Sequence, residues 1–324
     1  MKRAAVLSVL FLLCSCILIQ VSHAADLTIV TGNEKGTYYR FGLDLKELGA
    51  SHGFNLNVVP TNGSIDNLYA VYRRRATQLG IVQADVLAFI SRVKSDDMLS
   101  SVARKTKMVF PLYNEEVHLL AREDITDFDG LEGKRVAIGE EGSGTYLTAK
   151  LLLEMSKVKP AQQVIIGTDE ALAKLKAGKI DAMFYVAGYP VKLFAESVKE
   201  GDGVKLASIG NQNILRYYPK ARIPGNTYSW QKEALDTVAV KAVLVAYDFR
   251  TVNCENVGKF AKVIWDNQDW LARNGHPKWK SVDLEYELKG WEQYDCVRRH
   301  IDIAKRKDPA RLNPIFNAVK EILE

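Results

Sequence analysis

The sequence predicts an α/β fold of two lobes, with mostly parallel sheets, helices on both faces of the sheets, and a cleft between the lobes. Two observations support this prediction. Short apolar runs alternate with amphipathic segments along most of the chain, which is typical of βαβ units. The triplet Gly-Thr-Tyr occurs twice, at 36–38 and 144–146, each time between a strand-like run and a helix-like segment. We expect one copy in each lobe.

The first third of the chain after its apolar N-terminus alternates strands and helices. Apolar periodicity predicts strands at 27–30, 56–59 and 80–82, and helices at 37–48, from 64 onward and at 86–93. Ser64 is the expected N-cap of the second helix. A longer apolar stretch at 113–121 is expected to run between the lobes.

The alternation restarts after a polar turn at 129–135. We expect a second set of strands and intervening helices, with strands at 136–138, 164–166, 180–186 and 204–209, and helices at 147–155, 169–177 and 190–198. A further strand is predicted at 237–245, and the chain after Asn256 reads as mainly helical. Four tryptophans in this last region are expected to be core residues: Trp265, Trp270, Trp279 and Trp291.

These elements divide the chain into four parts. We expect a signal peptide at 1–24, the first part of lobe 1 at 25–117 and lobe 2 at 118–208. The remainder, 209–324, is expected to return to lobe 1 and to add the C-terminal helices. Removal of the signal would leave a chain long enough for two domains of ordinary size.

The N-terminus has the pattern of a secretory signal. Lys2 and Arg3 precede an almost wholly apolar run at 4–19. Ser22 and Ala24 are small residues at the positions that a signal peptidase reads, so we place cleavage after Ala24. The alternative is a transmembrane anchor, which the short run and the lack of following stop-transfer charges disfavour. We therefore expect a soluble periplasmic monomer. Its net charge falls from +5 to about +3 when the two basic signal residues are removed, which favours neither nucleic acid nor a membrane surface as partner.

Cys254 and Cys296 are the cysteines that would remain after cleavage. Two cysteines in an exported chain are most simply a disulfide, and the alternative is a pair of buried thiols. In the loop-entropy model, a bridge between them would contribute on the order of 4 kcal/mol.

The sequence lacks the motifs of the common catalytic, metal and nucleotide sites. It has no Cys-x-x-Cys and no His-Glu-x-x-His, so no metal site is predicted. Glu141 stands where a Gly-x-Ser-x-Gly nucleophile elbow around Ser143 would need its first glycine. Neither glycine-bearing turn matches a P-loop or a dinucleotide fingerprint. We expect a binding protein without cofactor or enzymatic activity.

Short polar residues follow the carboxyl ends of successive predicted strands, where open α/β sheets bind ligands. Hydroxyl and amide groups can orient a small polar ligand, and glycine-bearing turns before helices present backbone N–H groups to an anion. The alternative for Ser64, Asp85 and Thr145 is a role as helix caps. Arg40 either pairs with a ligand carboxylate or points to water. The predicted ligand-binding residues are Gly36, Thr37, Tyr38, Arg40, Ser64, Asn67, Gln83, Asp85, Ser143, Gly144, Thr145 and Tyr185.

The two Gly-Thr-Tyr turns are expected to differ in role. The first turn precedes Arg40 and is expected to lie near Ser64 and Gln83, so we expect it to set specificity. We expect the second turn to close on the ligand. Asp181 is expected to anchor a loop rather than to perform acid–base chemistry.

Several short motifs occur in a fixed order. They are Gly-Thr-Tyr-Tyr at 36–39, Gly-Ser-Ile-Asp-Asn-Leu at 63–68, Gly-Ile-Val-Gln-Ala-Asp at 80–85, Leu-Glu-Gly-Lys-Arg-Val at 131–136, Gly-Ser-Gly-Thr at 142–145, Ile-Pro-Gly-Asn-Thr-Tyr at 223–228 and Asp-Thr-Val-Ala-Val at 236–240. Over about 26–250 the chain resembles the TAXI family, the extracytoplasmic solute-binding proteins of tripartite ATP-independent periplasmic (TRAP) transporters.

The resemblance implies a type II periplasmic binding fold with a hinge. It implies a ligand such as glutamate, 2-oxoglutarate or another small carboxylate, and delivery to a membrane permease driven by an ion gradient. The cleft residues it implies are Thr37, Tyr38, Ser64, Asn67, Gln83, Ser143, Gly144 and Thr145. The chain departs from the family pattern at Arg40, where proline is frequent, and from His276 onward.

Two other functions fit the same sequence. A sensory binding protein would use the same cleft but dock on a receptor kinase instead of a permease. An enzyme on this fold would need an acid or a nucleophile at the centre of the cleft, and Asp85 is the candidate.

Overall fold

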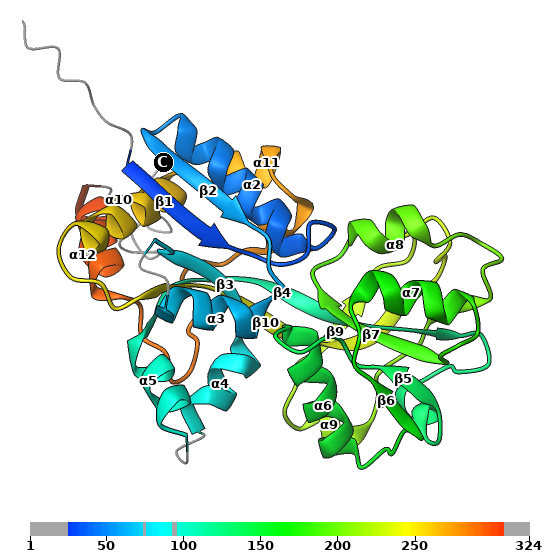
Figure 1. Cartoon of the computed structure of the whole chain (residues 1–324). Coiled ribbons are helices and arrows are strands. Elements are labelled where there is room, and N and C mark those ends of the chain that lie inside the picture. Colours follow the sequence, from blue (N-terminus) through cyan, green and yellow to red (C-terminus); the bar gives the residue numbers. More distant parts are fainter. Residues whose placement is uncertain (1–24, 74–75, 93–95, 308–324) are drawn as a thin grey trace, which may run out of the picture.

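Two α/β lobes joined by long strands make up the protein (Figure 1). The computed structural model describes residues 25–73, 76–92 and 96–307, so the predicted signal peptide lies outside the described residues. Strands β4 (Thr106–Arg122) and β10 (Leu235–Tyr247) run from one lobe into the other and pair antiparallel. The predicted two-lobed α/β fold is confirmed.

Lobe 1 contains the N-terminal strands and the helices that follow them. Its strands are β1 (Ala25–Val30), β2 (Phe54–Val59) and β3 (Leu79–Gln83), and its helices are α2 (Thr37–Ala50), α3 (Ser64–Arg73), α4 (Ala84–Arg92) and α5 (Asp97–Lys105). β1 lies between β2 and β3 and is parallel to both. The carboxyl ends of these strands therefore point toward lobe 2.

Lobe 2 repeats this alternation with shorter strands. It comprises η1 (Phe128–Leu131), β5 (Arg135–Ala137), α6 (Gly144–Ser156), β6 (Gln162–Val164), α7 (Thr168–Lys176), β7 (Ala182–Ala187), α8 (Lys192–Ser197), β8 (Val204–Leu206), α9 (Gln212–Leu215) and β9 (Lys220–Ile223). Its buried apolar residues also come from the chain after 209, including Ile214, Tyr218, Ile223 and Val238. The chain passes from lobe 2 back to lobe 1 along β10.

The sheet is more mixed than the sequence alone indicates. Its path is β2-β1-β3-β10-β4-β7-β5-β6, with parallel pairs toward the two ends and antiparallel pairs at β3–β10, β10–β4 and β4–β7. The reason is that β4 leaves lobe 1 and β10 returns in the opposite direction, so the strands that connect the lobes are antiparallel.

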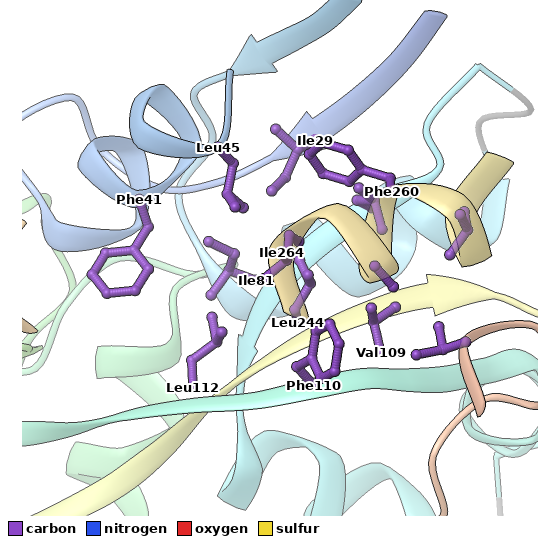
Figure 2. Close-up of a cluster of buried hydrophobic side chains, with 14 of the residues drawn as sticks. Ile29, Phe41, Leu45, Ile81, Val109, Phe110, Leu112, Leu244, Phe260 and Ile264 are labelled. Carbon is purple, nitrogen blue, oxygen red and sulfur yellow. The ribbon is translucent and has the colours of Figure 1, made fainter. Parts of the chain in front are cut away.

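The lobe 1 core includes both N-terminal and C-terminal segments. Figure 2 shows Phe41 of α2, Ile81 of β3 and Leu244 of β10 in one cluster with Phe260 and Ile264. The last two belong to the C-terminal group of helices, which is α10 (Val252–Asp266), α11 (Gln268–Asn274), η2 (Pro277–Ser281) and α12 (Asp295–Lys307).

The C-terminal region holds the cysteines and tryptophans that the sequence singled out, and Trp291 lies between η2 and α12, where it is partly buried. Cys254 on α10 and Cys296 on α12 form a disulfide, as predicted. Trp265 and Trp279 are buried in the lobe 1 core, and Trp270 packs against it. Among the described residues, no helix has the length and apolar character needed to cross a bilayer.

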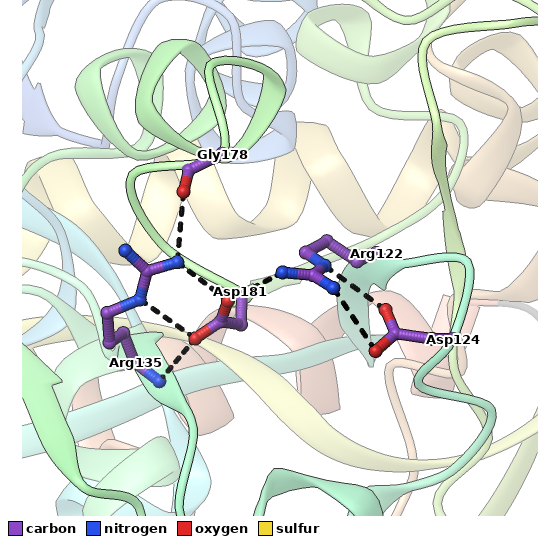
Figure 3. Close-up of polar contacts among 5 residues, drawn as sticks. All are labelled: Arg122, Asp124, Arg135, Gly178 and Asp181. Atoms are coloured by element: carbon purple, nitrogen blue, oxygen red, sulfur yellow. Dashed lines mark hydrogen bonds and ion pairs between the residues drawn. The ribbon is translucent and has the colours of Figure 1, made fainter.

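Asp181 connects three strands of lobe 2, as Figure 3 shows. Its carboxylate accepts hydrogen bonds from the backbone N of Arg135 at 2.8 Å, from Arg135 Nε at 3.0 Å and from Arg122 Nη1 at 3.3 Å. The Arg135 hydrogen bond is the main cause of a pKa for Asp181 of about 2. The carboxylate thus fixes the ends of β4, β5 and β7, as expected of a structural anchor.

We expect Asp181→Asn to lower stability by about 1–2 kcal/mol at pH 7. The folded-state pKa lies below the unfolded value, so the stabilisation is complete above about pH 4 and disappears as the pH falls toward 2. Urea unfolding at pH 7 and pH 2.5 measures this difference. Asp124→Asn is the control, since Asp124 pairs with Arg122 at the surface. Equal effects of the two substitutions at pH 7 would contradict the anchor role.

Candidate functional site

A small polar pocket lies between the two lobes. Its volume of about 60 Å³ exceeds the 10–15 Å³ or so that one water molecule needs. The loops after β1, β2, β5 and β6 and the ends of β3 and β7 contribute to its wall. The pocket contains nine of the predicted ligand-binding residues: Gly36, Thr37, Tyr38, Ser64, Gln83, Ser143, Gly144, Thr145 and Tyr185.

Four helices begin at this pocket. Lobe 1 contributes the first residues of α2 and α3, Thr37 and Ser64, and lobe 2 contributes those of α6 and α7, Gly144 and Thr168. The N-terminal end of a helix carries a partial positive charge and backbone N–H groups without intrahelical partners. The two Gly-Thr-Tyr turns thus meet across the pocket, and the arrangement favours an anion.

The lobe 1 wall is held by hydrogen bonds between its polar side chains and the backbone. Ser64 Oγ accepts from the backbone N of Gln83 at 3.0 Å, so this serine joins α3 to β3. Tyr38 OH lies 3.4 Å from Ser64 Oγ, and Thr37 Oγ1 donates to the carbonyl of Gly188 at 2.6 Å. These contacts fix the orientation of the hydroxyl groups in the wall.

The lobe 2 wall is also held by hydrogen bonds between side chains and the backbone. Ser143 is the N-cap of α6, where its Oγ accepts from the backbone N of Tyr146 at 3.0 Å. Thr145 Oγ1 accepts from the backbone N of Val186 at 3.1 Å and so ties α6 to β7. Gly144, between them, presents backbone to the pocket without a side chain.

Three predicted residues do not line the pocket. Arg40 is exposed on α2. Asn67 is fully buried, where its Nδ2 donates to the carbonyl of Ile81 at 2.7 Å and to that of Thr31, which holds α3 against the sheet. Asp85 is half-buried to one side, against lobe 2. The structure therefore does not bring these three residues to the pocket, because residues at the end of one strand or turn point in different directions.

Asp85 links the lobes rather than facing the pocket. Its Oδ2 accepts from Thr148 Oγ1 at 2.7 Å and from Tyr218 OH at 2.8 Å. Burial raises the pKa of this carboxyl, and the two hydroxyl donors oppose that rise. Asp85 is therefore part of a partly buried contact between α4 and lobe 2.

Sequence reasoning missed two acidic residues of the pocket wall, Glu115 and Glu140. Glu115 is 2% exposed and accepts a hydrogen bond on Oε2 from Tyr38 OH at 2.7 Å. Burial is the main reason that the pKa of Glu115 lies well above its ordinary value. The available signal was a pair of consecutive glutamates inside the apolar stretch 113–121.

The two lobes touch each other around the pocket. The backbone N–H groups of Ile65 and Asp66 both donate to the carbonyl of Gly142 at 3.0 Å. Lys35 forms an ion pair with Asp169 of α7 across the opening. Together with the contacts of Asp85, these bonds describe a closed arrangement of the lobes.

Comparison with solved structures finds chains with similar arrangements. An amino acid ABC transporter substrate-binding protein from Streptococcus pneumoniae bound to L-arginine has 16% identity and a TM-score of 0.47, with 80% of this chain and 95% of that chain covered. An arginine 3rd transport system periplasmic binding protein from Legionella pneumophila has 15% identity and a TM-score of 0.46, with 76% and 94% covered. A Corynebacterium glutamicum OxyR C206 mutant has 13% identity and a TM-score of 0.49, with 84% and 72% covered.

The amino-acid sequence also matches one protein-family model. The model of the NMT1-like family covers residues 29–292, which include both lobes and every pocket residue named above. Because the match spans most of the chain, the protein belongs to the NMT1-like family.

Proposed function

We propose that this protein is a periplasmic solute-binding protein that captures a small carboxylate, glutamate- or 2-oxoglutarate-like, and delivers it to a TRAP-type secondary transporter. The observation that carries the proposal is the convergence of four helix N-termini, two from each lobe, on one small polar pocket. A carboxylate there would receive backbone N–H groups from both lobes at once. The ordered TAXI-like motifs at 36–39, 63–68 and 142–145 supply the first residues of three of these helices and support the TRAP assignment.

Hinge closure is the proposed mechanism. We propose 25–117 and 118–208 as the lobe segments, with 209–324 returning to lobe 1 along β10 after its first residues have packed in the lobe 2 core. Bending of β4 and β10 would separate the two pairs of helix N-termini, and a ligand bound by both pairs would stabilise the closed form. Such a ligand shifts the population only by its difference in affinity for the two forms.

Binding without catalysis is supported by the way the polar side chains are held. Asp85, the catalytic candidate from the sequence, accepts hydrogen bonds from Thr148 and Tyr218 outside the pocket wall. The hydroxyls of Ser64 and Thr145 accept backbone N–H groups, and Glu115 in the wall accepts a hydrogen bond from Tyr38. Turnover of a carboxylate by the purified protein that vanished in Asp85→Asn or in Glu115→Gln would contradict this assignment.

The test is a thermal-shift screen of the purified protein against amino acids and mono- and dicarboxylates. A ligand at 100 times its Kd should stabilise the folded state by about 2.7 kcal/mol, because it binds the folded form and not the unfolded one. If no small carboxylate raises the melting temperature, the proposal fails.

Transport and sensing are separated by a second measurement. Membrane vesicles that contain a TRAP permease should accumulate the bound carboxylate only when this protein and an ion gradient are both present. A carboxylate-dependent rise in kinase activity of a receptor, without uptake, would favour the sensory role instead.

A further inference from the structure

The pocket combines two features that prefer opposite charges. Four helix N-termini favour an anion. Glu115 in the same wall is a buried carboxyl, with one oxygen bonded to Tyr38 and no basic side chain beside it among the described lining residues. A ligand that carried only negative charge would disfavour the ionised form of Glu115 further, whereas a positive group beside that carboxyl would favour the ionised form and bind it.

The buried lysine near Glu115, Lys278, is already paired with another carboxylate. Lys278 of η2 donates to Glu116 Oε1 at 2.7 Å, and both side chains are less than a tenth exposed. Lys278 Nζ also lies 3.7 Å from the centre of the Tyr189 ring. Glu116 therefore has its own positive partner, whereas Glu115, the next residue along β4, has a neutral phenol as its hydrogen-bond partner.

We propose that Glu115 receives the ammonium group of the ligand, so that the site selects an α-amino acid over the carboxylic acid of the same skeleton that lacks the amine. This inference rests on the proposed function and decides between its glutamate-like and 2-oxoglutarate-like ligands. The carboxylate of such a ligand binds the helix N-termini, and the ammonium group binds Glu115. Both preferences of the pocket are then satisfied by one small zwitterion.

The electrostatic surroundings of Glu115 agree with this role. Burial and the charges of Asp85 and Glu116 disfavour its ionised form, and Tyr38 and Lys278 favour it only in part. An ammonium group at hydrogen-bond distance would add the missing positive charge. Charge-assisted hydrogen bonds of this kind are the strong ones in protein interiors.

The experiment measures dissociation constants by calorimetry for matched acids that differ in the amine. The probes are L-glutamate with 2-oxoglutarate, L-alanine with pyruvate, and L-phenylalanine with phenylpyruvate. We expect one amino acid to bind at least about 30-fold more tightly than its oxo acid. In Glu115→Gln the amino acid should lose at least about 30-fold in affinity, while the oxo acid should bind unchanged or more tightly.

Glu140→Gln is the matched control, because Glu140 is the other carboxyl of the pocket wall. It should change the affinities for the amino acid and the oxo acid by the same factor, so that their ratio stays as in the wild-type protein. If Glu115→Gln does not fold, as judged by circular dichroism, the selectivity of the wild-type protein decides the question.

Two outcomes separate this inference from the proposed function. An oxo acid that binds the wild-type protein as tightly as its amino acid overturns the role of Glu115 and leaves carboxylate binding intact. Failure of every probe and every carboxylate in the thermal-shift screen removes the proposed function itself.

Discussion

Replacing Gly144 with alanine should weaken ligand binding about 10- to 100-fold while leaving each lobe folded. A Cβ atom at this position would lie 2.7 Å from Ser64 Oγ and closer still to Gln83 Oε1, both of which belong to lobe 1. Gln83 is buried and its Oε1 lies 3.3 Å from Thr148 Oγ1, so its side chain has little room to move. Overpacking of this kind costs about 1–3 kcal/mol, and here the cost falls on the closed form alone.

The measurement is the dissociation constant of the ligand found by the thermal-shift screen, together with the urea midpoint of the protein without ligand. Gly210→Ala is the control, because a Cβ there meets nothing within 4 Å. If Gly144→Ala binds as tightly as Gly210→Ala, the two lobes do not close through this contact.

Phe41→Ala should give the largest loss of stability among the substitutions considered, about 3–5 kcal/mol. The Phe41 ring is fully buried, stacks on Trp279 with 4.2 Å between ring centres and lies 4.4 Å from the ring of Tyr113. It therefore joins α2, the strand β4 and the C-terminal segment η2 in one core. Truncation leaves a cavity that three separate parts of the chain would have to fill.

Chemical denaturation followed by tryptophan fluorescence measures this loss, since Trp279 lies against the removed ring. Phe89→Ala provides the comparison, because Phe89 is 41% exposed on α4 and should change stability by only about 0.5 kcal/mol. A loss below about 1 kcal/mol for Phe41→Ala would show that the C-terminal segment contributes little to the lobe 1 core.

The arrangement of the strands and helices was largely predictable because it depends on local patterns. The helix predicted from 64 onward is α3, which begins at Ser64, and the second Gly-Thr-Tyr turn does precede a helix, α6. The long strand β4 was only partly predicted, as 113–121, because its first half contains Pro111, a residue that argues against a central strand. Its antiparallel pairing with β10 joins segments more than a hundred residues apart, which no local pattern encodes.

The sequence by itself determined that the chain alternates strands and helices and that two glycine-bearing turns precede helices. These features follow from local patterns, which a linear sequence displays. The sequence favoured a disulfide between Cys254 and Cys296, and the structure decided between that bridge and two buried thiols. Only the tertiary structure decided that Arg40, Asn67 and Asp85 lie outside the pocket and that Glu115 lies inside it. The physical reason is that burial and side-chain direction are set by the packing of distant segments, so that Glu115 and Glu116, adjacent on one strand, contact Tyr38 and Lys278 from opposite ends of the chain.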